Sequence, residues 1–589
     1  MTESLKYDRR EFVNYFASMG LGSTLFPGIL WAKLDAGADI TVATIASAEE
    51  VAGLKFDEAE RAMMLDGLKQ QEQRIEALHK LPIPNSLAPA IRFDPVPPWR
   101  TPPRAAKKPM IRGPVTARAV TSNLEDLAFL PVTELSDLVR RRKVTSLQLT
   151  QMYLARLKKY DPVLKAVITL TEDRALAQAR AADAEISRGK YRGPLHGIPW
   201  GAKDLLAVKG YKTTWGAGPY KDQVINEDAT VVQRLDAAGA VLVAKLTLGE
   251  LAQGDIWFGG TTKNPWKVDQ GSSGSSAGPA SATAAGLIGF GIGSETLGSI
   301  SSPSTRCGTT GLRPTYGRVP KTGAMALSWT MDKLGPLCRS VEDCALVLDA
   351  IYGPDGKDAS SIDASFHWDA SLKPNKLRIG YFKAAFDLPL TDPKDEKRTL
   401  HPTKKFDDAA LAVLRGMGVN LIPVEVPDLP YDAMRIILTA EAAAAFDEMT
   451  RTDRDNLMVQ QGKFDWPNTF RTARFIPAVD YVNANRVRTD AIRAWDDLMQ
   501  KVDVIVTPTG AAGLSQLVAT NLTGHPAVIL PNGFREDGTP VSLTFLGGLF
   551  EEAKVLAVAN AYQRATGFHL VHPKIPLTPP PPPPPPAKS

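Results

Sequence analysis

Two short segments rich in glycine and serine contain the residues best suited to chemistry. One runs from Gly271 to Pro279 and the other from Gly293 to Pro303. The first leads into an alanine-rich stretch, where Ser276 and the proline indicate a helix start with free backbone N–H groups. The second follows an apolar run, residues 287–292, that predicts a buried strand. A strand that ends in such a turn can expose a serine hydroxyl beside converging N–H donors, which is an arrangement suited to acyl transfer.

Two other uses of these segments fit the sequence less well. A phosphate-binding loop would end in Gly-Lys-Ser/Thr, and neither segment does. The nucleophile elbow of Ser-His-Asp hydrolases, Gly-x-Ser-x-Gly, has one literal match at residues 274–278. The preceding residues 267–270 are too polar and too few for the buried strand that an elbow requires. We therefore expect neither a phosphate site nor a histidine-based triad here.

A third segment, Gly197 to Asp204, has the sequence Gly-Ile-Pro-Trp-Gly-Ala-Lys-Asp. Taken together, the three segments resemble the motifs of the amidase signature family of hydrolases. The family's lysine motif corresponds to residues 197–204, its serine-rich motif centres on Ser275 and Ser276, and its nucleophile motif corresponds to residues 293–303. The likeness covers roughly residues 123–572.

The resemblance implies a Ser-Ser-Lys triad that needs no histidine, cofactor or metal ion. Ser299 would be the nucleophile, Ser275 would be a bridging serine after a cis peptide bond, and Lys203 would be the base. Lysine can act as a base only when it is neutral, which requires burial or nearby positive charge. The resemblance also implies an oxyanion hole of backbone N–H groups, from Thr296, Leu297, Gly298 and Ser299.

Three residues depart from the family pattern beside the expected nucleophile. Leu297 replaces a glycine, Ser301 replaces an arginine, and Ala277 replaces a glycine. Leucine at position 297 is strained if the backbone there needs a positive φ, and otherwise it narrows the acyl pocket. Trp257 and Trp329 are candidate walls of the substrate pocket, although packing in the core is the more common role of such residues.

The predicted fold class is α/β, because helical and strand-like segments alternate from residue 123 to residue 573. The resemblance implies a central mixed β-sheet covered by helices on both faces. In front of this catalytic domain we expect a helical hairpin at residues 39–81, in which Asp57 and Glu60 form a capping box. Residues 82–122 form a proline-rich extended arm, and residues 574–589 form a proline-rich tail.

The composition excludes several classes of function. A net charge of +5 over 589 residues, without a long Lys/Arg run, argues against a nucleic-acid partner. The three cysteines cannot supply a disulfide framework, and the seven scattered histidines do not indicate a metal site.

The N-terminus carries features of an export signal. Arg9 and Arg10 precede a mostly apolar segment, residues 12–31, and residues 36–38 have the small-x-small form of a cleavage site. This pattern predicts a twin-arginine-type signal over residues 1–38 and a periplasmic or extracytoplasmic protein with no stable membrane anchor. The alternative is an amphipathic N-terminal helix, interrupted by Pro27, in a cytoplasmic protein.

The expected function is therefore hydrolysis of a carboxylic amide through an acyl-enzyme, with cleavage of esters as a side activity. Two alternatives stay open: the glutaminase component of a tRNA-dependent amidotransferase, and a non-catalytic binding protein on an amidase scaffold. Residues 40–81 resemble the small partner protein of that glutaminase, which favours a self-contained enzyme. We expect a small-molecule amide as substrate and a monomer or homodimer, and aliphatic, aryl, peptide and carbamate substrates all remain open.

Overall fold

The computed structural model describes residues 40–578, except residues 53, 82, 88, 90, 116–119 and 511–512. The predicted export signal and the end of the predicted tail, residues 579–589, lie outside the described residues. The described residues of Met1–Leu87 and Arg474–Asp480 form one compact unit, and those of Ala88–Ala473 and Tyr481–Ser589 form another. Among the helices of the described part, none is long and apolar enough to span a bilayer.

The described part of the smaller unit contains a helical hairpin. The predicted capping box is confirmed: the Asp57 N–H donates to Glu60 Oε2 and the Glu60 N–H donates to Asp57 Oδ1, each at 2.8 Å. Arg61 joins the two helices, because its guanidinium donates to both carboxylate oxygens of Glu49 at 2.9 Å. The helices are α3 (Val42–Ala52) and α4 (Glu58–His79).

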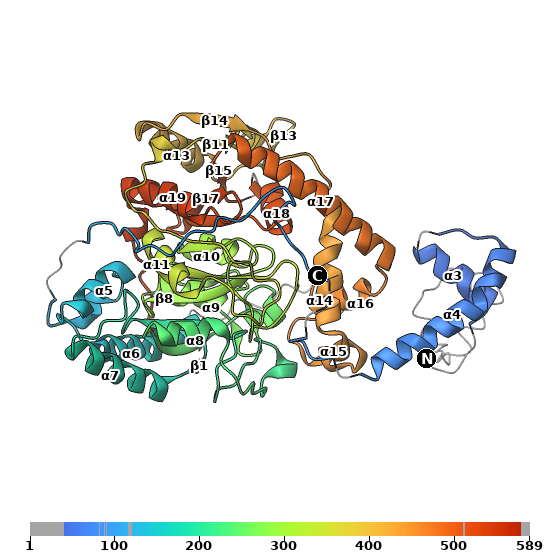
Figure 1. Ribbon diagram of the computed structural model, residues 1–589, viewed down its shortest axis with the longest axis horizontal. Coiled ribbons are helices and arrows are strands. Elements are labelled where there is room, and N and C mark those ends of the chain that lie inside the picture. Colours follow the sequence, from blue (N-terminus) through green and yellow to red (C-terminus); the bar gives the residue numbers. More distant parts are fainter. Residues whose placement is uncertain are drawn as a thin grey trace, which may run out of the picture. The chain divides into compact units, whose positions relative to one another are not determined.

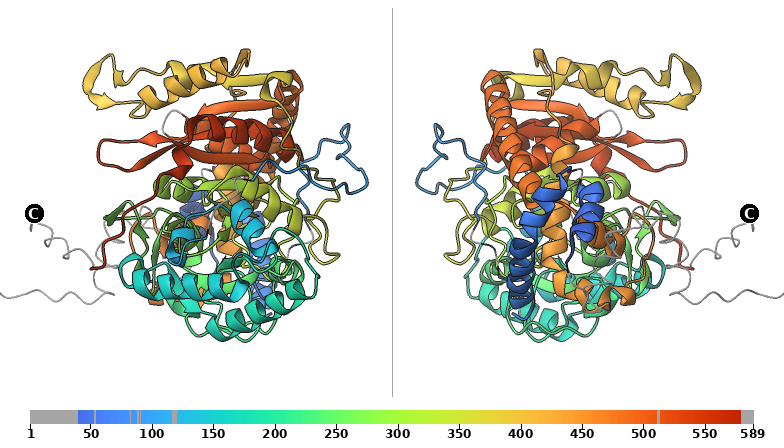
Figure 2. Two further views of the ribbon diagram at one scale, coloured as in Figure 1. Left: turned by 90° about the vertical axis from the view of Figure 1, so that its left-hand side faces the viewer. Right: turned by 90° about the vertical axis from the view of Figure 1, so that its right-hand side faces the viewer.

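The larger unit is built on one mixed sheet of eleven strands. Their order across the sheet is β1 (Val167–Leu170), β3 (Val241–Leu246), β2 (Pro199–Lys203), β8 (Phe290–Glu295), β10 (Lys333–Cys338), β9 (Thr310–Arg313), β16 (Ala527–Phe534), β17 (Pro540–Gly547), β15 (Val504–Pro508), β11 (Ile379–Phe382) and β14 (Leu421–Val424). β2 runs parallel to β3 and β8, whereas β8 runs antiparallel to β10. The predicted mixed α/β sheet is therefore confirmed. In Figures 1 and 2, the green strands of the first half of the chain and the yellow to red strands of the second half occupy opposite ends of this sheet.

Helices cover both faces of the sheet, and consecutive residues of β10 pack on opposite sides. Leu337 belongs to a cluster with alanines of α9 and with Cys307 of α10. Cys338 belongs to the main core, which includes Val341 and Cys344 of α11. Alternation of this kind follows from the two-residue period of a strand. The helices that cover the centre of the sheet are α9 (Ala277–Ala284), α10 (Ser301–Cys307), α11 (Val341–Ile351) and α19 (Glu552–Thr566).

The remaining helices of the larger unit surround this centre. They are α5 (Val132–Arg140), α6 (Ser146–Leu164), α7 (Glu172–Ser187), α8 (Thr230–Ala237), α12 (Lys383–Asp387), α13 (Lys404–Gly416), α14 (Ile436–Ala445), α15 (Asp447–Arg451), α16 (Trp466–Ala473), α17 (Ala478–Lys501) and α18 (Leu514–Thr523). The segment that precedes them, residues 89–115, contains no helix among its described residues and packs on the body. Phe93 contacts Tyr316, with ring centroids 5.0 Å apart, and the Gly113 N–H donates to Glu342 Oε1 at 2.8 Å.

The strand before the expected nucleophile begins later than the sequence indicates. The apolar run predicts a strand over residues 287–292, but β8 spans Phe290–Glu295. Leu287 and Ile288 instead form a bend and pack with Ala175 and Ala179 of α7. Both the bend and the strand are buried, so hydrophobicity alone cannot separate them. The predicted helix start at Ser276 is confirmed, because α9 begins at Ala277.

Candidate active site

Lys203 lies at the carboxyl end of β2, with its side chain fully buried. Its side-chain nitrogen Nζ donates to three serine hydroxyls: Ser275 Oγ at 2.9 Å, Ser276 Oγ at 3.1 Å and Ser294 Oγ at 2.9 Å. Among the described residues, no carboxylate forms an ion pair with this lysine. The structure therefore brings together two of the predicted catalytic residues, Lys203 and Ser275.

The surroundings of Lys203 favour the neutral amine. Burial lowers the pKa of Lys203 well below its ordinary value of 10.5. The more distant carboxylates of Asp332 and Glu295 act in the opposite direction, but burial dominates. Hydroxyl groups can accept hydrogen bonds from the amine without supplying the negative charge that would hold its proton. A buried lysine with these partners is suited to accept a proton from a serine.

Ser275 and Ser276 sit between a short strand and the start of α9. The preceding strand, β7 (Lys267–Gly271), pairs only with β6 (Lys263–Asn264) and is not part of the central sheet. This placement agrees with the absence of a nucleophile elbow predicted from the sequence. The Gly274–Ser275 peptide bond is cis, as the family resemblance implies.

Glycines allow the serine segment to approach its neighbours closely. A Cβ atom on Gly274 would lie 1.8 Å from the Gly254 carbonyl oxygen, and one on Gly293 would lie 2.6 Å from Ser276 Oγ. A larger residue at Gly274 would push the serine segment away from Gly254, and one at Gly293 would push it away from β8. Such a shift would also separate Ser276 from Ser294, whose backbone N–H and C=O both bond to the Ser276 hydroxyl, at 3.1 and 3.0 Å.

Ser299 follows β8 and lies just before α10, with 8% of its surface exposed. The Ser276 N–H donates to the Ser299 carbonyl oxygen at 3.1 Å, so the two serine segments are in direct contact. Ser275 and Ser299 are both described, and no hydrogen bond joins their hydroxyls in this structure. Catalytic hydrogen bonds often tighten only when substrate binds. The third predicted residue is thus next to the other two.

Backbone N–H groups without acceptors surround Ser299. Within the described residues, the N–H groups of Thr296, Leu297, Gly298 and Ser299 have no hydrogen-bond acceptor. Gly298 has a φ of +88°, whereas Leu297 is not in the left-handed region. Leu297, which replaces a family glycine, is therefore not under backbone strain. The other predicted effect of this leucine, a narrower acyl pocket, stays a prediction. Four consecutive free donors are the feature that an oxyanion hole requires.

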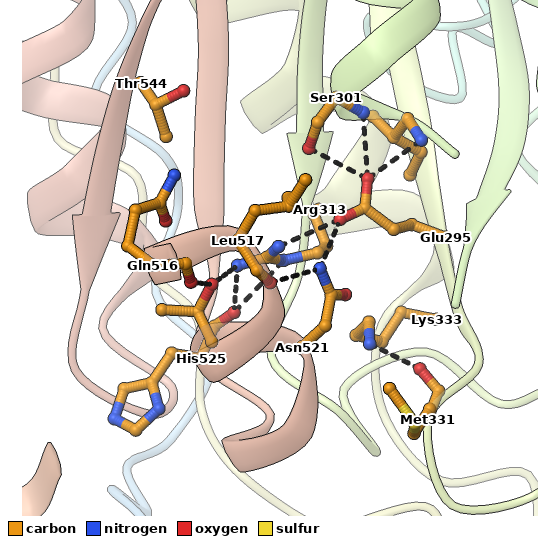
Figure 3. A network of polar contacts seen from close by, with 12 residues as sticks. Glu295, Ser301, Arg313, Met331, Lys333, Gln516, Leu517, Asn521, His525 and Thr544 are labelled. Atoms are coloured by element: carbon orange, nitrogen blue, oxygen red, sulfur yellow. Dashed lines mark hydrogen bonds and ion pairs between the residues drawn. The ribbon is translucent and has the colours of Figure 1, made fainter. Parts of the chain in front are cut away.

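Glu295 holds the segment between β8 and α10 in place (Figure 3). One carboxylate oxygen, Oε2, accepts from the N–H groups of Ile300 and Ser301 and from Ser301 Oγ, at 2.8 to 2.9 Å. The other, Oε1, accepts from Arg313 Nη1 and Asn521 Nδ2, each at 2.9 Å. Burial alone would raise the pKa of Glu295, but Arg313 and these donors lower it to about 2. Arg313, from β9, thus supplies a buried positive charge to this segment, whereas the family arginine position holds Ser301.

A second carboxylate fixes the start of the same segment. Thr296 Oγ1 donates to Asp332 Oδ1 at 2.5 Å, and Asp332 Oδ2 accepts from the N–H groups of Leu327 and Ser328 at 2.8 and 3.0 Å. The Ser328 hydroxyl in turn donates to Glu441 of α14 at 2.6 Å. Sequence analysis missed Asp332, Ser294 and Glu441. Only Ser294 carried a usable signal, because it lies within the nucleophile motif.

Among the described contacts, none places Trp257 or Trp329, the two predicted walls of the substrate pocket, against Ser299. Trp257 is 8% exposed and meets Phe258 edge to face, with centroids 4.9 Å apart. Trp329 is partly buried, and its carbonyl oxygen accepts from the Tyr316 hydroxyl at 2.7 Å. Among the described residues, no cluster of His, Cys, Asp and Glu side chains could hold a metal ion.

Comparisons with known proteins identify the family of the chain. The sequence matches the Amidase family model over residues 148–556. It is 34% identical to the A component of the glutamyl-tRNA(Gln) amidotransferase of Moorella thermoacetica over 495 residues, which covers 76% of this chain and 99% of the relative. The corresponding A component from Acinetobacter baumannii is 32% identical over 483 residues, with 76% of this chain and 98% of the relative covered.

Solved structures give the same result. The native peptide amidase from Stenotrophomonas maltophilia superposes with a TM-score of 0.64 at 30% identity, covering 75% of this chain and 98% of that chain. The A component of the glutamyl-tRNA(Gln) amidotransferase from Thermotoga maritima superposes with a TM-score of 0.62 at 25% identity, covering 74% and 95%. The chain therefore belongs to the amidase signature family, a family of hydrolases that act on carbon–nitrogen bonds.

Proposed function

We propose that this protein hydrolyses a carboxylic amide through an acyl-enzyme, with Ser299 as the nucleophile. The observation that carries the proposal is the environment of Lys203, which is buried, has no ion pair to any described carboxylate and bonds to three hydroxyls. A lysine kept charged for structural reasons is normally paired with a carboxylate, as Lys245 is with Asp204 at 2.7 Å. Lys203 instead fits the role of a base.

The proposed reaction begins when Ser299 Oγ attacks the amide carbonyl carbon. Its proton passes to Ser275 Oγ, whose own proton passes to the neutral Nζ of Lys203. The negative charge that forms on the carbonyl oxygen is held by the free backbone N–H groups of residues 296–299. The C–N bond then breaks as the proton returns through Ser275 to the leaving amine. Water attacks the acyl-enzyme by the same route, which releases the carboxylic acid and restores Ser299.

A second candidate, glutamine hydrolysis as the glutaminase component of an amidotransferase, has direct support from the curated relatives. Those relatives are named as amidotransferase components and are matched over 98 to 99% of their length. The chemistry at Ser299 would be the same, but the leaving group would be ammonia and a partner protein would use it. The solved peptide amidase, at 30% identity, supports the simpler amidase. The two candidate functions differ in substrate and use the same catalytic residues.

Labelling with a fluorophosphonate probe tests the nucleophile. The purified full chain should react, and Ser299→Ala should abolish labelling. Ser304→Ala is the matched control, because Ser304 is a buried serine on the adjacent helix whose hydroxyl has no partner among the described residues. Its variant should label like the wild type. An unlabelled wild-type protein, or labelling that survives Ser299→Ala, would contradict the proposal and favour a non-catalytic binding protein.

A substrate panel separates the two candidates. Free glutamine, a peptide amide, an aliphatic amide and an aryl anilide are incubated with the enzyme, and ammonia and amine release are measured. Turnover of glutamine alone, increased by a partner protein, would favour the amidotransferase. Turnover of the other amides by the isolated chain would favour the amidase.

Export of the protein is a separate proposal. It rests on Arg9 and Arg10 and the apolar segment after them. Fractionation of cells that produce the full chain should find it outside the cytoplasm, and replacing both arginines by lysine should retain it inside. Cytoplasmic location of the unmodified chain would contradict export and leave the amidotransferase partner possible.

A further inference from the structure

A cavity of about 540 Å³ lies on the outer side of α10. Its walls come from α10, from the start of α18, and from the hairpin between β16 and β17. Figure 3 labels several of its lining residues together: Ser301, Arg313, Gln516, Leu517 and Thr544. The volume falls within the range of small-molecule sites.

The cavity borders the segment that carries Ser299. A Cβ atom on Gly298, the residue before the nucleophile, would lie 3.2 Å from Ser302 Oγ and 3.5 Å from Leu517 Cδ2. Both of these residues line the cavity, as does Ser273, two residues before Ser275. Ser299 itself does not line the cavity, so a substrate held at its hydroxyl must extend one end past Ser302 to reach this space.

The cavity is lined by two exposed arginines, Arg306 and Arg535, on which the carboxylates of Asp255 and Asp537 act only at longer range. Arg306 donates to Gln270 Oε1 at 3.2 Å, and Arg535 donates to the Pro540 carbonyl oxygen at 2.6 Å. Among the described residues neither guanidinium has a carboxylate partner. The acidic residue of the lining, Asp537, is engaged by Lys267 at 3.3 Å and by the Thr539 hydroxyl. Two arginines thus remain available for an anion.

The third arginine of the lining, Arg313, is not available, because its charge is neutralised by Glu295. A buried amide adds a further binding group. Gln516 is 4% exposed and lines the cavity, yet its Oε1 has no hydrogen-bond partner in the described part of the chain. Buried amide oxygens without partners are uncommon, and this one would accept a hydrogen bond from an N–H or O–H group of a ligand.

We propose that the cavity binds a carboxylate carried by the amide substrate, with Arg306 and Arg535 as its cationic partners. This inference rests on the proposed amidase function and narrows its substrate class to amides that bear an acidic group. Planar guanidinium groups suit a carboxylate because they offer paired N–H donors. The carboxylate can lie on the acyl side or on the amine side of the scissile bond, and the test distinguishes them.

Matched chromogenic anilides test the proposal. Succinyl 4-nitroanilide carries an acyl-side carboxylate, the butyryl amide of 4-aminobenzoate carries an amine-side carboxylate, and butyryl 4-nitroanilide is the neutral reference. The wild type should turn over one acidic substrate with a kcat/KM about 3- to 10-fold above its neutral counterpart, the range expected because both guanidinium groups are exposed to solvent. The neutral counterpart of the aminobenzoate amide is the butyryl amide of 4-aminoacetophenone, which contains no ester bond. The preference should decrease as salt is added.

Arg306→Gln and Arg535→Gln should each remove most of this preference and leave the neutral substrates within about twofold. Arg180→Gln is the control, because Arg180 is an exposed arginine of α7 and its variant makes the same change of net charge. Equal rates on acidic and neutral substrates, or a preference that survives both substitutions, would overturn the proposal.

Binding separates this proposal from the proposed function. Titration calorimetry on Ser299→Ala protein with succinyl 4-nitroanilide and with the aminobenzoate amide measures affinity without turnover. Binding that Arg306→Gln weakens about threefold or more supports the carboxylate site even if the wild type hydrolyses none of the anilides. No binding of either compound, or binding that the substitution does not change, overturns the site even if neutral amides are hydrolysed.

Discussion

Replacement of Lys203 by methionine tests the central claim about the base. Methionine has a similar length and volume, so it should fill the buried space without a large cavity. It removes the nitrogen that bonds to Ser275, Ser276 and Ser294 and leaves those three hydroxyls in place. The scaffold and the backbone donors around Ser299 should therefore persist while proton transfer is lost.

The expected loss follows from the role of a positioned base. General-base catalysis contributes about 100- to 10,000-fold in rate, which corresponds to about 2.7 to 5.5 kcal/mol of transition-state stabilisation. The wild-type kcat/KM should rise with pH and reach a plateau once Lys203 is deprotonated. Because burial lowers the pKa of Lys203, that plateau should begin well below the ordinary lysine value of 10.5. The Lys203→Met profile should lack this rise.

Lys333→Met is the matched control. Lys333 is also buried, its pKa is also lowered well below the ordinary value by burial and then by Arg313, and its Nζ donates to the Met331 carbonyl oxygen. Within the described part of the chain it makes no hydrogen bond to the serines around Lys203, so its variant should keep the wild-type pH profile. The assay is hydrolysis of a chromogenic amide from about pH 5 to 9. Activity of Lys203→Met within about threefold of wild type, or a wild-type rate that falls over this range, would refute the reasoning.

Three further outcomes follow from the carboxylates of the site. Glu295→Gln should lower the free energy of unfolding by about 3 to 5 kcal/mol, because Arg313 would keep a buried charge without its partner. Denaturant titration measures this free energy, and a loss below about 1 kcal/mol would contradict the prediction. Glu295 has a pKa lowered from 4.5 to about 2, so it stabilises the fold above pH 4.5 and this contribution is lost as pH falls toward 2. As pH is lowered, Glu295→Gln should therefore lose free energy of unfolding less steeply than the wild type does. Identical pH dependence of the two proteins would argue against a lowered pKa of Glu295. Asp332→Ala should lower kcat by about 10- to 100-fold with little change in KM, because Thr296 loses the acceptor of its hydroxyl, and a change confined to KM would contradict this.

Local sequence was sufficient wherever the relevant interactions are local. The capping box of α4 joins Asp57 and Glu60, three residues apart, and its chemistry is contained in those residue types. The start of α9 after Ser276 is also predicted, although the Ser276 hydroxyl makes no capping bond and instead bonds to Lys203 and Ser294. The start of β8 is not predicted correctly, because the first residues of the same apolar run form a buried bend and not a strand.

The sequence by itself determined the inventory of the site: a lysine motif, two serine-rich segments and the family to which they belong. Only the tertiary structure decided which groups meet. Lys203 and Ser294 are 91 residues apart, and Glu295 and Asn521 are 226 apart, yet both pairs bond at 2.9 Å. In the described part of the chain, the same folding leaves Lys203 without an ion pair to a carboxylate and gives Glu295 an arginine partner, so their pKa values move in directions that no local pattern encodes. Burial and charge pairing are properties of the packed sheet and helices, and they depend on contacts between segments that lie far apart in the chain.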